Sequence, residues 1–132
     1  MIRILIVEDR KDQCKRMTQI LQKAFPNHEI FGVGSVNEAK NKIKELRSIT
    51  LAIVDYELND GNGYELLEYF KENLSNVPVI IVTAYGKDEN KEVRAGLSLI
   101  KGAADFMHKP IEDVDELIQR VKHCIEIAEL SV

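Results

Sequence analysis

The sequence is poor in the residues that mark secreted, metal-cluster and fibrous proteins. Among 132 residues there are two cysteines, three prolines, seven glycines and no tryptophan. Cys14 and Cys124 are too far apart in the sequence to suggest a zinc site, and both fall on apolar positions of helical patterns. We therefore expect reduced thiols in the core. A hydrophobic content of 45% with 30% charged residues also excludes a disordered or collagen-like chain.

Long hydrophobic runs and an excess of positive charge are missing as well. The opening MIRILIVEDR contains a short apolar run before two acids, which is too short for a signal peptide or a membrane span. The formal net charge is -4, whereas nucleic-acid binding normally needs a clustered basic face. We expect a cytoplasmic protein that makes no direct contact with nucleic acid or membrane.

What the sequence does contain is a regular series of strand-like apolar segments. The first, third and fourth are nearly continuous in Ile, Val and Leu, which is typical of strands buried on both faces of a parallel sheet. The second and fifth are weaker and indicate edge strands. The five segments are residues 2–7, 29–33, 51–54, 79–82 and 105–107.

Segments with helical period separate these strands. The first helix should end before Pro26, and the second should begin at Ser35, with Glu38 in the capping-box position. The third should run from about residue 64 to residue 73. The residues on the apolar stripes of the five helices are Cys14, Met17, Ile20, Leu21 and Ala24; Ala39, Ile43 and Leu46; Leu66, Leu67 and Phe70; Val93, Leu97 and Ile100; and Val114, Leu117, Ile118, Val121, Ile125 and Ala128.

This alternation predicts one α/β domain over residues 1–132, with a core of about residues 2–128. Five βα units joined by right-handed crossovers, (βα)5, form a three-layer, doubly wound parallel five-stranded sheet with helices on both faces. In such sheets ligands bind beyond the carboxyl ends of the strands. The side chains at those ends are therefore the candidates for function.

Polar side chains stand at the ends of four strands. Glu8 and Asp9 follow the first strand, Asp55 the third, Thr83 the fourth and Lys109 the fifth. Singly, each has a structural interpretation, such as a helix cap or an exposed lysine. Together, three carboxylates at one edge repel one another until a cation binds, and Mg²⁺ fits best because it takes carboxylates, waters and a phosphoryl oxygen. The lysine and the hydroxyl complete a pocket for a phosphoryl group.

Four motifs carry a resemblance to a known family: ILIVED, AIVDYELNDGNG, VIIVTA and GAADFMHKP. Over essentially its full length the chain resembles the receiver domains of bacterial two-component response regulators. The resemblance implies the strand order 2-1-3-4-5. It also implies a signalling domain that is no enzyme beyond its own phosphorylation and autodephosphorylation. The phosphoryl group would come from a sensor histidine kinase, a phosphotransfer protein or a small phosphodonor.

The resemblance assigns the acidic residues to phosphoryl acceptance and metal binding. Asp55 would be the phosphoacceptor. Asp9 would be the main ligand of Mg²⁺, for which Mn²⁺ is a substitute. Glu8 would hold a metal-bound water, and Asp55 itself and the backbone carbonyl of Glu57 would complete the protein ligands.

The remaining motif residues would form a switch. Thr83 and Lys109 would bind phosphoryl oxygens, and the movement of Thr83 would let the ring of Phe106 turn inward. The bond between Lys109 and Pro110 is expected to be cis. The face made by the fourth helix, the fifth strand and the fifth helix would then change, and an output domain or protein partner would bind there. A homodimer is a further option.

Several positions depart from the family pattern. Asn59 stands where proline is usual, which predicts a more mobile loop, and Phe106 lacks the hydroxyl of the commoner tyrosine, which disfavours an outward ring. The segment 83–109 is longer than usual by about four residues, close to one helical turn, and predicts an added turn in the fourth helix or the loop before it. Glu57 and Tyr85 flank the pocket and are expected to affect the lifetime of the phosphorylated state.

Three other functions compete with this interpretation. A phosphorylation-independent interaction module would keep the fold without the chemistry, but Asp9, Asp55, Thr83 and Lys109 are all present. A flavodoxin-like nucleotide binder needs a glycine-rich loop after the first strand, where VEDRKD stands. A phosphatase with an aspartate nucleophile would need that aspartate after the first strand and an added cap. The helical run toward Leu130 favours an excised domain over a stand-alone one.

Overall fold

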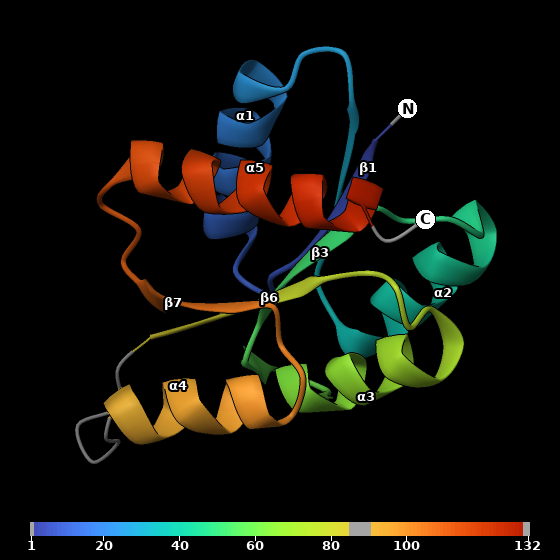
Figure 1. Ribbon diagram of the computed structural model, residues 1–132, viewed down its shortest axis with the longest axis vertical. Helices are drawn as coiled ribbons and strands as arrows, with labels where there is room; N and C mark the ends of the chain where they lie inside the picture. Colours follow the sequence, from blue (N-terminus) through green and yellow to red (C-terminus); the bar gives the residue numbers. More distant parts are fainter. Residues whose placement is uncertain (1, 85–90, 131–132) are drawn as a thin grey trace.

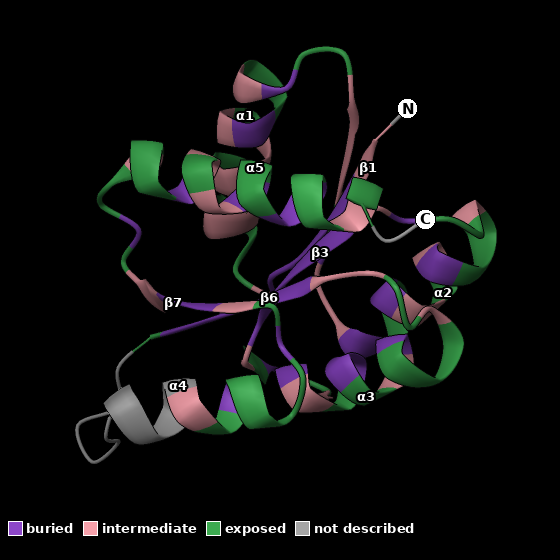
Figure 2. Cartoon of the chain, viewed as in Figure 1, coloured by how far each residue is buried: buried purple, intermediate pink, exposed green. Residues whose placement is uncertain are grey.

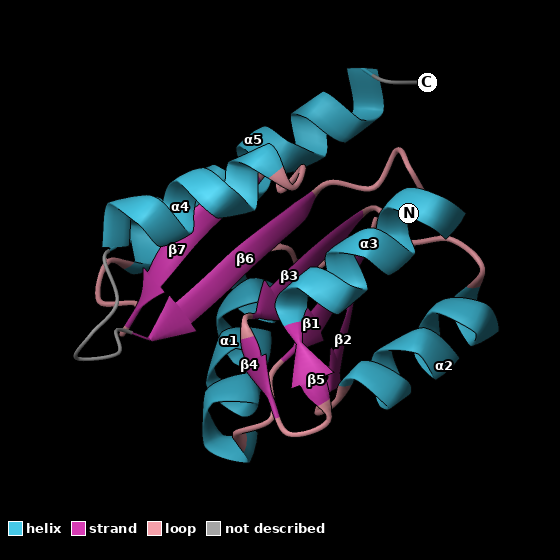
Figure 3. Cartoon of the chain, turned by 90° about the horizontal axis from the view of Figure 1, so that it is seen from below, coloured by secondary structure: helices cyan, strands magenta, loops and turns pink. Residues whose placement is uncertain are grey.

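A single five-stranded parallel sheet forms the centre of the molecule (Figures 1 and 3). The computed structural model describes residues 2–84 and 91–130, and excludes the side chains of residues 91–95. The sheet order is β2-β1-β3-β6-β7, which confirms the order predicted for the five main strands. The strands are β1 (Arg3–Val7), β2 (Glu29–Val33), β3 (Leu51–Asp55), β6 (Val79–Ala84) and β7 (Asp105–Lys109).

Helices cover both faces of the sheet, as the alternating pattern predicted. In Figure 1, α1 and α5 lie on one side of the sheet and α2, α3 and α4 on the other. The helices are α1 (Lys11–Ala24), α2 (Val36–Leu46), α3 (Gly63–Asn73), α4 (Lys91–Ile100) and α5 (Val114–Leu130). None of the described helices is long and apolar enough to cross a membrane.

The central strands supply a hydrophobic core on each face of the sheet. Because successive side chains of a strand point to opposite faces, Leu5 and Val7 pack with α2 and α3, whereas Ile4 and Ile6 pack with α1 and α5. All four side chains are buried, and Figure 2 shows the same inner sheet as buried. Because both faces of these strands are buried, their sequences are continuous runs of apolar residues.

The predicted start of the second helix at Ser35 is confirmed, although the Glu38 side chain binds a different amide from the one that a capping box uses. The Ser35 hydroxyl accepts a hydrogen bond from the amide of Glu38 at 3.0 Å, as a capping box requires. The Glu38 carboxylate accepts from the amide of Gly34 at 2.8 Å, so its return bond goes to the residue before the cap. Both bonds satisfy donors at the entrance to α2.

The predicted apolar stripe of the fourth helix is wrong for two of its three residues. Leu97 is 42% exposed and Ile100 is 82% exposed, while the third, Val93, lies outside the described side chains. Among residues 96–100 of this helix, whose side chains are described, Ser98 is buried, and its hydroxyl lies 2.9 Å from the hydroxyl of Tyr64 on α3. A buried hydroxyl is stable when it has such a partner, so α4 can turn a polar side chain inward.

Two short strands after β3 were not predicted. β4 (Glu57–Leu58) and β5 (Gly61–Asn62) pair antiparallel, and they join Asp55 to α3 through a small hairpin. The added turn predicted within the segment 83–109 remains a prediction, because residues 85–90 lie outside the described residues. The prediction for Tyr85 falls on the same residues.

The two cysteines differ in burial. Cys124 on α5 is buried in the core, whereas Cys14 on α1 is half-buried and packs at the edge of that core. Both are free thiols, as the sequence predicted.

Candidate functional site

Parallel register brings the polar strand ends to one edge of the sheet. Val7 pairs with Val54, so the next residues along these strands, Glu8 and Asp55, emerge side by side. Asp55 in turn pairs with Val82, and Ala84 pairs with Lys109. The site therefore depends on the sheet order, because β1 and β3 must be neighbours for these carboxylates to meet.

Three carboxylates form a compact acidic cluster at this edge. One oxygen each from Glu8, Asp9 and Asp55 lies within 4.8 Å of the others. Glu8 and Asp55 are buried, with 5% and 7% of their surface exposed. Burial, reinforced by the neighbouring Glu8 carboxylate, raises the pKa of Asp9 above its usual value. The cluster thus has the donor atoms and the unfavourable charge of a site that a hard divalent cation would stabilise.

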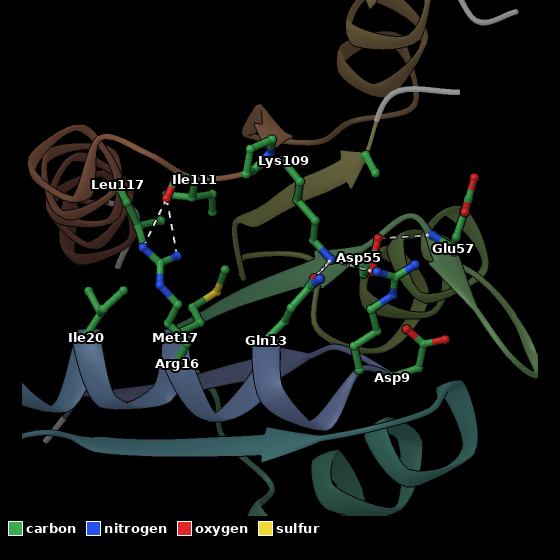
Figure 4. Close-up of a pocket in the computed structure, with 13 residues that line it drawn as sticks. Asp9, Gln13, Arg16, Met17, Ile20, Asp55, Glu57, Lys109, Ile111 and Leu117 are labelled. Carbon is green, nitrogen blue, oxygen red and sulfur yellow. Dashed lines mark hydrogen bonds and ion pairs between the residues drawn. The ribbon is translucent and has the colours of Figure 1, made fainter. Parts of the chain in front are cut away.

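Lys109 provides the positive charge beside these carboxylates. Its ammonium group donates to Glu8 Oε1, to Asp55 Oδ2 at 2.9 Å and to Gln13 Oε1 at 2.8 Å. Figure 4 shows Lys109 reaching down from β7 toward Asp55 and Gln13. The peptide bond between Lys109 and Pro110 is cis, as predicted from the sequence.

Backbone amides complete the environment of two carboxylates. The amide of Glu57 donates to Asp55 Oδ1 at 3.3 Å, and the amide of Arg10 donates to Glu8 Oε2 at 3.2 Å. Asp55 is therefore held through one oxygen by the hairpin and through the other by Lys109. The side chain of Glu57 is exposed and points away from Asp55 in Figure 4.

The two predicted switch residues lie on β6 and β7 and do not belong to the acidic cluster. Thr83 is buried at the end of β6, and its hydroxyl donates to the carbonyl of Ala84 at 3.2 Å. Phe106 is buried near the start of β7, and its ring packs edge-on against His108 with 4.8 Å between ring centroids. The ring is thus inward, in the orientation expected for an aromatic residue without a hydroxyl.

A cavity of about 360 Å³ opens from the acidic cluster along α1. Its polar end is lined by Asp9, Gln13, Asp55 and Lys109 (Figure 4). Its far end is apolar, and the Arg16 guanidinium donates across it to the carbonyl of Ile111 at 3.2 and 3.3 Å. The apolar lining includes Met17, Ile20, Ile111 and Leu117. The cavity is large enough for a small ligand or a partner side chain.

Sequence reasoning missed Gln13 as a site residue. The available signal was its place in the first turn of the helix after β1, since helices that follow strands begin at the carboxyl edge of the sheet. Its contact with Lys109 joins residues 96 positions apart, which no local pattern reveals.

Comparisons with known proteins agree with this fold. The model of the family described as "Response regulator receiver domain" matches residues 4–122. The chain is 30% identical over 132 residues to the two-component response regulator ORR1 of rice, Oryza sativa subsp. japonica, covering 92% of this chain and 54% of that protein. The chain thus spans about half the length of this curated relative.

Solved structures resemble the whole chain. A CheY-like response regulator receiver domain protein from Methanospirillum hungatei superimposes with a TM-score of 0.85 at 30% identity, covering 100% of this chain and 99% of that one. A beryllofluoride-activated NtrC4 receiver domain, described as a dimer, gives a TM-score of 0.84 at 28% identity, covering 97% of this chain and 99% of that one.

Proposed function

Because the chain belongs to the response regulator receiver family, we propose that it accepts a phosphoryl group on Asp55 in a Mg²⁺-dependent reaction. The donor is a sensor histidine kinase, a phosphotransfer protein or a small phosphodonor. The observation that carries the proposal is the setting of Asp55: a buried carboxylate beside Glu8 and Asp9, with one oxygen bound by Lys109 and the other by a backbone amide.

The acidic cluster fits a divalent cation. Glu8, Asp9 and Asp55 offer oxygen atoms within 4.8 Å of one another, and the backbone carbonyl of Glu57 would add a further oxygen. Such a donor set suits Mg²⁺, and Mn²⁺ accepts the same hard ligands. When bound, the ion neutralises negative charge on the carboxylates and on the incoming phosphoryl group.

The transfer step follows from the same residues. A carboxylate oxygen of Asp55 attacks phosphorus, and the bond from phosphorus to the donor atom breaks, with its electron pair leaving on the donor. A histidine donor then takes up a proton from water. The Lys109 ammonium group leaves Asp55 Oδ2 and donates to a phosphoryl oxygen instead. The Thr83 hydroxyl turns away from the Ala84 carbonyl and donates to a second phosphoryl oxygen. Positioning and charge neutralisation are the main contributions, since phosphoryl transfer spreads charge over the equatorial oxygens.

The switch starts at Thr83. Because the Phe106 ring is already buried beside His108, the signal does not require the ring to travel from solvent. Movement of Thr83 toward the phosphoryl group changes the packing around β7 and hence the face made by α4, β7 and α5. The helix α4 carries the exposed Leu97 and Ile100, and an output domain, a protein partner or a second copy binds at the face that α4 helps to form.

The remaining assignments follow from the same proposal. Residues 1–132 form one receiver domain that works in the cytoplasm, where sensor kinases present their phosphoryl groups. The domain has no catalytic activity beyond its own phosphorylation and dephosphorylation. Output belongs to an attached domain or to a bound partner.

Intact-mass measurement after incubation with acetyl phosphate and Mg²⁺ tests the proposal. The wild-type protein should gain one phosphoryl group, the isosteric variant Asp55→Asn should gain none, and EDTA should abolish the reaction. Asp113→Asn, at an exposed helix cap of α5, is the matched control and should react like the wild type. No gain in the wild type would instead support a phosphorylation-independent interaction module. An equal gain in Asp55→Asn would show that a residue other than Asp55 accepts the phosphoryl group.

A further inference from the structure

The hairpin after Asp55 is fastened to a helix that lies elsewhere in the sequence. The Asp60 carboxylate accepts hydrogen bonds from the first two amides of α2, from Val36 to Oδ1 at 2.8 Å and from Asn37 to Oδ2 at 3.0 Å. These donors hold the pKa of Asp60 below its usual value. Both oxygens of an exposed side chain are thus used to join the hairpin turn to α2.

The hairpin is also anchored at its other end. Leu58 is buried in the core, and the Asn62 side chain accepts from the amides of Tyr64 and Glu65 to cap α3. Between these anchors the turn consists of Asn59 and Asp60. Asn59 stands where the family usually has a conformationally restricted proline, and the Asp60 clamp provides a different restraint on the same turn.

The segment between β2 and α2, to which Asp60 binds, lies against Glu8 of the acidic cluster. The amide of Glu8 donates to the carbonyl of Val33 at 3.0 Å, at the point where β2 leads into α2. A Cβ atom added to the next residue, Gly34, would lie 3.8 Å from the carbonyl oxygen of Glu8. The hairpin, which begins at Glu57, is therefore tied through Asp60 to the segment that lies against Glu8.

We propose that Asp60 is a positioning residue for the divalent cation: by clamping the hairpin to α2, it sets the distance between the Glu57 backbone and the carboxylates of Glu8 and Asp9. Asp60 does not contact the ion. This inference rests on the proposed function, because it assumes that the acidic cluster binds Mg²⁺.

The test compares the Mg²⁺ affinity of two helix-cap variants. Asp60→Ala removes both acceptors at α2, whereas Asp113→Ala removes the acceptor for the Glu116 amide at α5, far along the chain from the hairpin. Affinity is measured by NMR titration of backbone amides with MgCl₂, without a phosphodonor. We expect Asp60→Ala to weaken Mg²⁺ binding about tenfold, the lower end of the range for residues that orient metal ligands, and Asp113→Ala to match the wild type.

Two further measurements separate positioning from loss of structure. Asp60→Asn keeps one oxygen acceptor and should bind Mg²⁺ with an intermediate affinity, even where Asp60→Ala folds poorly. Amide hydrogen exchange of Val36 and Asn37 should become faster in both Asp60 variants. Wild-type affinity in both Asp60 variants would overturn this inference alone, whereas absence of Mg²⁺ binding by the wild-type protein would overturn the proposed function together with it.

Discussion

Lys109 contributes directly to the charge balance at the site. Glu8 and Asp55 are both buried and both bind the ammonium group of Lys109. A buried carboxylate is stable in its charged form only when a cation or several hydrogen-bond donors compensate it. Lys109 therefore compensates two carboxylates of the cluster, while burial and the neighbouring Glu8 carboxylate raise the pKa of Asp9.

The two thiols should differ in their reaction with iodoacetamide. Burial raises the pKa of Cys124 to about 11 and also raises the pKa of Cys14. Only the thiolate reacts, and an unperturbed thiol ionises near a pKa of about 8.5. Near neutral pH, Cys124 should be alkylated only after unfolding in urea, while the half-buried Cys14 should react slowly in the folded protein.

Peptide mass spectrometry after pulse labelling measures both rates. As the pH rises, the labelling rate of Cys124 in the unfolded chain should increase through the ordinary thiol range, while in the folded protein it stays low until much higher pH. Equal rates for Cys124 in native and urea-unfolded protein would contradict the prediction.

The sequence could place the residues at the strand ends but not their partners. Glu8, Asp55 and Lys109 each follow an apolar run, and the parallel topology alone brings such positions to one edge. Gln13 and Asp60 act through contacts with residues that are distant in the sequence. Neither contact leaves a periodic pattern, so both required the folded structure.

At the scale of elements, periodicity revealed the helices more reliably than their orientation. The stripe of α3 was predicted correctly, since Leu66 and Phe70 are buried. In α4 the stripe through Leu97 and Ile100 faces outward, because a spacing of three and four residues identifies a face without saying what covers it. The hairpin of β4 and β5 was missed because two-residue strands are too short to show alternation.

The contact between α3 and α4 should depend on the Tyr64 hydroxyl. Tyr64→Phe keeps the ring beneath the Lys101 ammonium, which lies 5.2 Å from its centroid, but leaves the fully buried Ser98 hydroxyl without this partner. We expect the free energy of unfolding to fall by about 1 to 3 kcal/mol, the usual cost of leaving a buried polar group unpaired. Urea unfolding followed by circular dichroism measures it.

Two further variants make this element-scale test specific. Ser98→Ala should cost less, because the half-buried Tyr64 hydroxyl can reach water. Tyr69→Phe, a hydroxyl deletion at another half-buried tyrosine of α3, is the control and should change stability little. If Tyr64→Phe were no more destabilising than Tyr69→Phe, the bond between the two helices would contribute nothing measurable.

At the scale of the whole molecule, the site joins segments that meet only in the folded state. Lys109 at the end of β7 binds residues from β3, from the segment after β1 and from α1. The carboxylates are therefore close together only when the sheet is formed. A cation that binds this cluster selects the folded protein over the unfolded chain, so its affinity contributes directly to stability.

In Lys109→Met, Mg²⁺ should raise the free energy of unfolding by more than it does in the wild type. With EDTA, the variant leaves Glu8 and Asp55 without their shared cation, and we expect a loss of about 2 kcal/mol, less than the 3 to 5 kcal/mol typical of a fully buried broken pair because Lys109 is partly exposed. Saturating Mg²⁺ should restore much of the lost free energy of unfolding, because the bound ion replaces the positive charge that Glu8 and Asp55 shared.

Urea unfolding with EDTA and with MgCl₂ gives the free energy of unfolding without and with the ion. Lys122→Met, on the exposed side of α5, serves as the control. A Mg²⁺ stabilisation no larger in Lys109→Met than in Lys122→Met would show that lysine and cation do not balance the same charges.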